Sequence, residues 1–127
     1  MKGVNRVTLV GHLGKDPEML FLEGNIAVAK FSLATTDYFK DKAGKQFSQT
    51  EWHSIVLWRG LAELAQKFLH KGSLVFIEGR LKTKSWDDKE GHKKYLTEII
   101  GDNLIMLDKK SDTLTEENEE IDDKIPF

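Results

Sequence analysis

The chain has 127 residues, enough for one domain with a modest core, and its 31% charged and 39% hydrophobic residues are typical of a soluble globular protein. It contains no cysteine, which excludes a disulfide framework and thiolate chemistry. Residues 1–14 lack the continuous apolar run of a signal peptide, and the apolar run 74–77 is far too short to span a membrane. We therefore expect a cytoplasmic protein with no membrane partner.

The net charge of −2 conceals an uneven distribution along the chain. Residues 108–127 hold eight acids against three lysines, a net charge of −5, whereas residues 1–107 hold 16 basic and 13 acidic residues, a net charge of +3. A mildly basic body favours a polyanionic ligand. The acidic segment then has either a separate binding task or only a solubilising one.

The first half of the chain is β-prone. Residues 4–13 predict a strand that ends at the turn signal Gly-Lys-Asp-Pro, and the short apolar piece 19–22 can continue the sheet. Residues 26–36 predict the second long strand. Its apolar residues fall on one face: Ala27, Ala29, Phe31 and Leu33.

The next segment, 37–48, is polar and contains Gly44, which predicts a loop or a frayed hairpin. Aromatic and basic residues are interleaved in it: Tyr38, Phe39, Lys40, Lys42, Lys45 and Phe47. Core packing does not account for aromatics in a solvent-exposed loop.

The third strand, 49–58, has an unusual face. With a period of two, one face carries an ordinary core set: His53, Ile55 and Leu57. The other face carries Trp52 and Trp58, about 20 Å apart, with Ser54 and Val56 between them and Arg59 following. Flat aromatics beside a cation suit the binding of unstacked nucleobases and phosphates. The alternative is that both tryptophans belong to the core.

After this strand the apolar period becomes helical. An amphipathic helix of about three turns, ending near Gly72, is predicted by the spacing of Leu61, Leu64, Ala65, Phe68 and Leu69. The fourth strand, 74–86, is interrupted by Gly79, which indicates a bend or bulge. A hairpin loop at 87–92 leads to the fifth strand, 93–107.

The resulting order is β-β-β-α-β-β, an all-β chain with one helix. In a small protein this is the order of an OB-fold, a five-stranded Greek-key barrel that commonly binds oligonucleotides or oligosaccharides. We predict an OB-fold domain over residues 1–107. The acidic tail over residues 108–127 is predicted to be disordered on its own.

Signatures of catalysis and metal binding are absent from the sequence. There is no phosphate-binding Gly-x-x-x-x-Gly-Lys-Ser/Thr loop. The four histidines have no paired spacing for zinc: His12, His53, His70 and His92. No nucleophile–base pair is apparent. We expect neither an enzyme nor a bound metal or cofactor.

Several motifs occur in the same order as in a known family. They are GVNRV at 3–7, LVG at 9–11, QTEWH at 49–53, KGS at 71–73, IEG at 77–79, KTKSW at 82–86 and DDKIPF at 122–127. Each motif alone is weak, but together they are specific. Over residues 1–107 the chain closely resembles the bacterial single-stranded DNA-binding protein, SSB.

The resemblance implies a homotetramer of OB-folds that binds single-stranded DNA without sequence preference in DNA replication, recombination and repair. It implies an ssDNA-binding and oligomerisation role for residues 1–107. The family's base-stacking aromatics match Phe39, Trp52, Trp58 and Trp86. Phe39 stands where the family usually has tryptophan, and Trp58 where it usually has phenylalanine, so both positions keep a ring. The family's dimer contact implies an interface role for Asn5, Leu9 and His53. The alternative for His53 is a core histidine with a satisfied hydrogen bond.

The resemblance also implies that the C-terminal tip docks replication, recombination and repair enzymes. The tip residues are Asp122, Asp123, Ile125, Pro126 and Phe127. Lys124 interrupts the family's usual run of aspartates, and the tail has almost no Gly/Gln/Pro-rich linker. A protein with DNA and these enzymes as partners is expected to be cytoplasmic and nucleoid-associated.

Basic residues of the body are candidate phosphate partners. We assign this role to Arg6, Lys15, Lys30, Lys40, Arg59, Arg80, Lys82 and Lys84. Further candidates are Lys42, Lys71, Lys93 and Lys94. Two other functions stay open: an OB-fold adaptor or primosome-type accessory protein with mainly protein ligands, and a structural oligomer with incidental nucleic-acid affinity.

Overall fold

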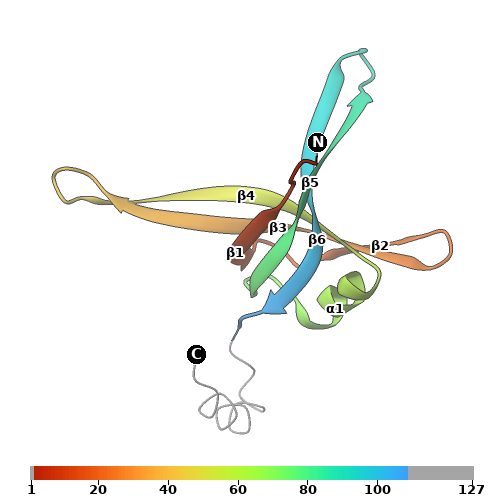
Figure 1. Cartoon of the computed structure of the whole chain (residues 1–127), viewed down its shortest axis with the longest axis horizontal. Coiled ribbons are helices and arrows are strands. Elements are labelled where there is room, and N and C mark those ends of the chain that lie inside the picture. The colour runs from red at the N-terminus through yellow and green to blue at the C-terminus, as the bar shows by residue number, and fades with distance from the viewer. Residues whose placement is uncertain (1, 109–127) are drawn as a thin grey trace, which may run out of the picture.

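The computed structural model describes residues 2–108, so the tip and all of the predicted tail except Asp108 lie outside the described residues. Figure 1 shows the elements in chain order. They are β1 (Val7–Leu13), β2 (Glu18–Leu22), β3 (Ile26–Lys40), β4 (Gln46–Trp58), α1 (Gly60–Phe68), β5 (Leu74–Asp87) and β6 (Lys93–Met106).

Five of the strands close into a barrel. β1 pairs with β5, β5 with β6, β6 with β4, β4 with β3, and β3 with β1 again. Only the β4–β6 pairing is parallel. The closed barrel with one helix between the third and fourth of these strands confirms the predicted OB-fold.

The segment 18–22 forms a separate strand, which the sequence analysis did not count. β2 pairs only with β3 and lies at the edge of the sheet. The turn between them contains Gly24 and Asn25, both with positive φ. Glycine and asparagine tolerate this conformation better than other residues, so the chain folds back tightly and gives β2 a partner.

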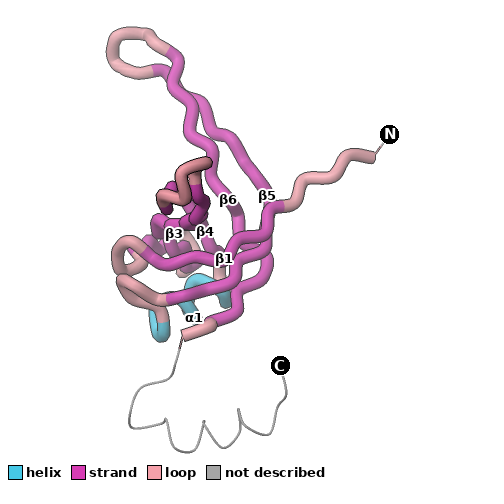
Figure 2. Tube along the Cα trace, turned by 90° about the vertical axis from the view of Figure 1, so that its left-hand side faces the viewer, coloured by secondary structure: helices cyan, strands magenta, loops and turns pink. Residues whose placement is uncertain are grey.

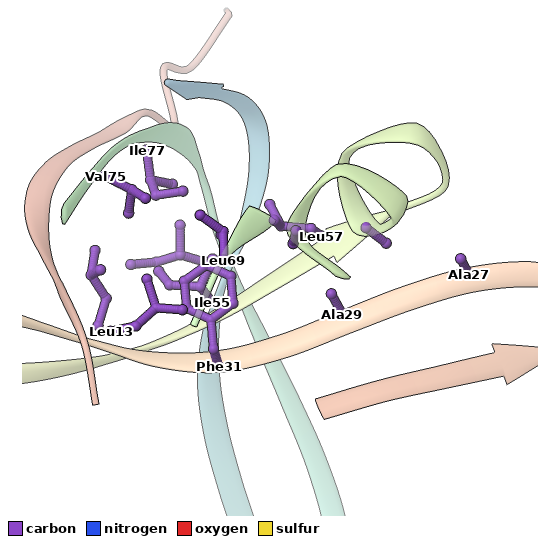
Figure 3. Packing of buried hydrophobic residues seen from close by; sticks show 13 residues of the cluster. Leu13, Ala27, Ala29, Phe31, Ile55, Leu57, Leu69, Val75 and Ile77 are labelled. Carbon is purple, nitrogen blue, oxygen red and sulfur yellow. The ribbon is translucent and has the colours of Figure 1, made fainter. Parts of the chain in front are cut away.

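The core forms where the inward faces of β3, β4 and β5 meet the helix (Figure 3). The alternation in the sequence places these residues inside: Ala29, Phe31, Leu33, Ile55, Leu57, Val75 and Ile77. The helix adds Ala62 and Ala65. Phe31 is a core residue, in agreement with the apolar face that the sequence gives to Ala27, Ala29, Phe31 and Leu33.

The helix is shorter than its apolar spacing predicts. It ends at Phe68, and Leu69 already has extended φ and ψ while its side chain is buried. Phe68, predicted on the apolar face, lies on the surface with 56% exposure, and the buried helix residues are Ala62 and Ala65. Gly72 does not end the helix. It lies in the turn that Ser73 N closes by donating to His70 O at 3.0 Å.

Two long hairpins extend beyond the barrel as arms (Figure 1), and Figure 2 shows the β5–β6 arm from the side. The β3–β4 arm comprises residues 36–50, and the β5–β6 arm comprises residues 81–97. Almost every residue of both arms is exposed. The segment predicted as a loop or frayed hairpin is thus a continuous hairpin. The irregularity predicted at Gly79 is confirmed by a register shift between Glu78 and Gly79.

No helix within residues 2–108 is both long and apolar enough to span a membrane.

Candidate nucleic-acid interface

Trp52 and Trp58 lie on the outer face of β4. The strand alternation buries Ile55 and Leu57 in the core, so the two indoles are turned the other way. Trp52 is 61% exposed and Trp58 41% exposed. The alternative that both tryptophans are core residues is therefore wrong, and both rings present an open surface.

Trp52 rests directly on the backbone of Gly14. A Cβ added to Gly14 would come within 2.5 Å of Trp52 Cζ3 and 2.9 Å of its Cη2. The Gly14 backbone is itself held in place, because its N–H donates to Ser32 O at 3.0 Å. The absence of a side chain at Gly14 thus creates the seat on which the indole lies.

Trp58 forms one wall of a groove of about 460 Å³. Its apolar lining comprises Leu20, Leu22, Val28, Val56 and Ile100. Its charged lining comprises Lys30, Arg59, Arg80, Lys82, Lys84, Glu98 and Asp102. An aromatic wall above an apolar floor, with several cations around it, suits flat rings linked by anionic groups.

A second hollow, of about 240 Å³, shares Lys30 and Glu98 with this groove. Lys15 lines the second hollow. The two hollows therefore adjoin and together collect six of the eight assigned basic residues. Arg6 and Lys40 line neither hollow, since Arg6 precedes β1 and Lys40 lies near the tip of the β3–β4 arm.

Two of the groove cations are paired with acids. Arg80 Nη1 lies 2.9 Å from Asp102 Oδ1, with both side chains about half exposed. Lys84 Nζ lies 3.1 Å from Oε1 of the buried Glu98. Among residues 2–108, no ion pair involves Lys30, Arg59 or Lys82. These three cations are the ones best placed to receive an incoming anion.

The other two predicted aromatics lie on the arms, away from the groove. Phe39 is 50% exposed on the β3–β4 arm, and Trp86 is 48% exposed on the β5–β6 arm, opposite Lys94. The arms point in different directions in Figure 1. The structure therefore spreads the four aromatic residues over the molecule and does not gather them in one pocket.

The residues assigned to an oligomer interface have contacts within their own chain. Asn5 extends the β1–β5 ladder: its Nδ2 donates to Leu81 O and its Oδ1 accepts from Leu81 N, both at 2.9 Å. Leu9 packs against the core. His53 is half-buried, with Nε2 2.9 Å from Thr35 Oγ1. An interface role for these residues stays a prediction.

Sequence reasoning missed several residues of this surface. Leu20 and Leu22 resembled an ordinary apolar piece, and only the β2 hairpin brings them beside Trp58. Glu98 is buried and lines both hollows, which no pattern around it in the sequence indicates. Gly14 belongs to no phosphate-binding motif, and its role as the seat of Trp52 follows only from the fold. Within residues 2–108, no group of three or more His, Cys, Asp or Glu side chains could hold a metal ion.

Comparison with known proteins gives a consistent result. A family model described as the single-strand binding protein family matches residues 4–107. The chain is 49% identical over 110 residues to single-stranded DNA-binding protein 1 of Chlorobaculum tepidum, and the aligned region covers 86% of this chain and 68% of that protein. It is 41% identical over 127 residues to single-stranded DNA-binding protein 1 of Xylella fastidiosa, which covers 99% of this chain and 93% of that protein.

Two solved structures are similar to the fold described above. One is the Plasmodium falciparum SSB complex with ssDNA, with a TM-score of 0.77, 37% identity, and coverage of 85% of this chain and 98% of that chain. The other is a deletion mutant of the single-stranded DNA binding protein from Thermus aquaticus, with a TM-score of 0.72, 32% identity, and coverage of 85% and 52%.

Proposed function

This chain belongs to the single-strand binding protein family, and we propose that it binds single-stranded DNA without sequence preference. We propose further that it protects such DNA during replication, recombination and repair. The matched relatives are named as DNA-binding proteins and not as enzymes, in agreement with the prediction that the chain is not an enzyme.

The observation that carries the proposal is the groove beside Trp58, which has an apolar floor and three cations without an ion pair to any of residues 2–108. Bases stack on exposed rings, at about 1–3 kcal/mol per base. Phosphates lie against Lys30, Arg59 and Lys82, which have no ion-pair partner among the described residues. Since every base has a π-face, this binding is indifferent to sequence. A duplex hides those faces and is disfavoured.

The spread of the aromatics supports a long binding path. Trp52 and Trp58 lie on the barrel, while Phe39 and Trp86 lie on separate arms. We propose that a strand leaves the groove and continues along the arms, and that a homotetramer joins several such paths into one wrapping surface. Asn5, Leu9 and His53 are the proposed interface residues.

The acidic tail is proposed to recruit replication, recombination and repair enzymes in the cytoplasm, close to the nucleoid. The proposal rests on the apolar tip Ile125-Pro126-Phe127, which follows an acidic run. Such a tip suits a small hydrophobic pocket with a basic rim on a partner.

A titration with poly-dT, followed by intrinsic tryptophan emission, tests the function. Stacking on Trp52, Trp58 and Trp86 should quench the emission on binding. Repeating the titration at several salt concentrations should show log K falling by about 0.7 per neutralised phosphate for each unit of log salt concentration.

If poly-dT does not quench the tryptophan emission but the protein still binds protein partners, the chain would be an OB-fold adaptor of the primosome type. An affinity for poly-dT that did not change with salt would contradict the basic groove.

A further inference from the structure

The tip of the β3–β4 arm carries a pair of stacked rings. Phe39 and Phe47 are directly opposite each other in the antiparallel ladder, so both side chains lie on the same face of the arm. Their ring centroids are 5.7 Å apart and their planes differ by 23°. Phe47 is partly exposed, and the sequence analysis gave it no role.

The turn beneath this pair is tightly defined. Asp41 Oδ1 accepts hydrogen bonds from Ala43 N at 2.9 Å and from Lys45 N at 2.8 Å. Asp41 N donates to Lys45 O at 2.9 Å, and Gly44 supplies the positive φ that the turn requires. These bonds fix the place of Lys45, whose ammonium lies 5.5 Å from the Phe47 ring centroid. The turn thus sets the register that brings Phe47 onto Phe39.

Within residues 2–108, no hydrophobic core lies beneath Phe39, because residues 36–50 are exposed on both faces of the arm. Among the described residues, Phe47 is the only ring stacked on it. An exposed phenylalanine without such a neighbour samples several rotamers, and ordering it on binding costs conformational entropy.

We propose that Phe47 is a positioning residue for single-stranded DNA, which holds the Phe39 ring upright so that one ring face is covered and the other stays open to a base. This inference rests on the proposed function. It adds a residue to the binding machinery and assigns the hairpin turn a task, which is to preorganise a stacking surface far from the barrel.

The test measures binding of a fluorescein-labelled oligo-dT by the full-length protein, using anisotropy. Phe47→Ala should weaken binding about two- to tenfold, the range of one aromatic pair. Phe47→Tyr should restore it, because tyrosine keeps the ring. The decisive comparison is made in a Phe39→Ala background, where Phe47→Ala should have no further effect because Phe47 acts through Phe39.

Tyr38→Ala is the matched control, since Tyr38 lies one residue from Phe39, pairs with Ser48 and points to the other face of the arm. The Tyr38→Ala variant should bind oligo-dT as tightly as the wild type. All variants should also unfold at temperatures close to that of the wild type, because the replaced side chains are exposed. Additive losses in the double mutant would overturn the inference, because Phe47 would then bind DNA by itself. An equal loss for Tyr38→Ala would overturn it too.

Different results would contradict ssDNA binding by the protein and the role of Phe47 in it. Failure of the wild-type protein to bind oligo-dT would remove the proposed function. If Trp52→Ala and Trp58→Ala weaken binding but Phe47→Ala does not, the function stands and the role of Phe47 is wrong.

Discussion

Trp52 and Trp58 stand outside the core because the neighbouring β4 residues fill it. Replacing either tryptophan by alanine should therefore weaken ssDNA binding by about 1–3 kcal/mol, the contribution of one stacked base. A core tryptophan would instead cost about 3–5 kcal/mol of folding stability. Measuring poly-dT affinity and thermal unfolding on the same variants separates the two. Normal binding together with a much lower melting temperature would contradict the assignment of both residues to the DNA surface.

A side chain at Gly14 should disturb the position of the Trp52 ring. A methyl group there meets the Trp52 ring at 2.5 Å, so Gly14→Ala should displace the exposed indole and weaken ssDNA binding several-fold with little effect on unfolding. In a Trp52→Ala background the same change should be silent. Gly3→Ala is the control, because a Cβ at Gly3 meets no atom within 4 Å. A loss of affinity that persists without Trp52 would show that Gly14 acts on the loop and not on the ring.

Sequence patterns predicted the strands whose core face follows a two-residue period, although Val28 and Val56 on the opposite face are buried as well. The alternation around Ile55 and Leu57, and the spacing of Ala27 to Leu33, reflect burial that is local to each strand. The predicted end of the helix was wrong, because Leu69 reaches the core in an extended conformation. Tertiary packing, which local spacing does not show, determines that conformation.

The candidate site was predictable only in part. Trp52 and Trp58 could be found from the two-residue period, since both lie on one strand. The groove could not, because its lining comes from five strands and the residue before the helix, and no spacing along the chain brings Leu22, Glu98 and Trp58 together. The Phe39–Phe47 stack depends on hairpin register, which the length and hydrogen bonds of the turn at Asp41 determine.

One whole chain of 14.5 kDa can contact only part of a long DNA strand, even with the groove and both arms engaged. We expect a homotetramer of about 58 kDa, four times the chain mass, because wrapping a long strand needs several copies of the groove and arms. Light scattering at micromolar concentration should give this mass, and a monomer would contradict the proposal. His53→Ala should lower the mass if the half-buried His53 contributes to the interface.

We expect the acidic tail to bind partner enzymes and residues 1–107 to bind ssDNA. Deleting residues 125–127 should abolish binding to partner enzymes, because the tip supplies the apolar contact. Removing residues 113–127 should leave ssDNA affinity equal or slightly higher, most visibly at low salt, where competition between the acids and DNA is least screened. Pull-downs with Phe127→Ala test the first point. A truncated protein that loses ssDNA binding would contradict the division.

The two arms have a consequence for hydrogen exchange. Backbone hydrogen bonds join the two strands of each arm, but none of the described residues forms a core beneath residues 36–50 or 81–97. Opening an arm therefore exposes little apolar surface and should cost far less free energy than opening the barrel. Amides of the arms should therefore exchange with solvent much faster than those of Leu57 or Ile77. Bound ssDNA should slow exchange mainly in the arms, since the barrel amides are already protected. Equal protection of arms and barrel in the free protein would show that the arms are held by contacts outside the single chain.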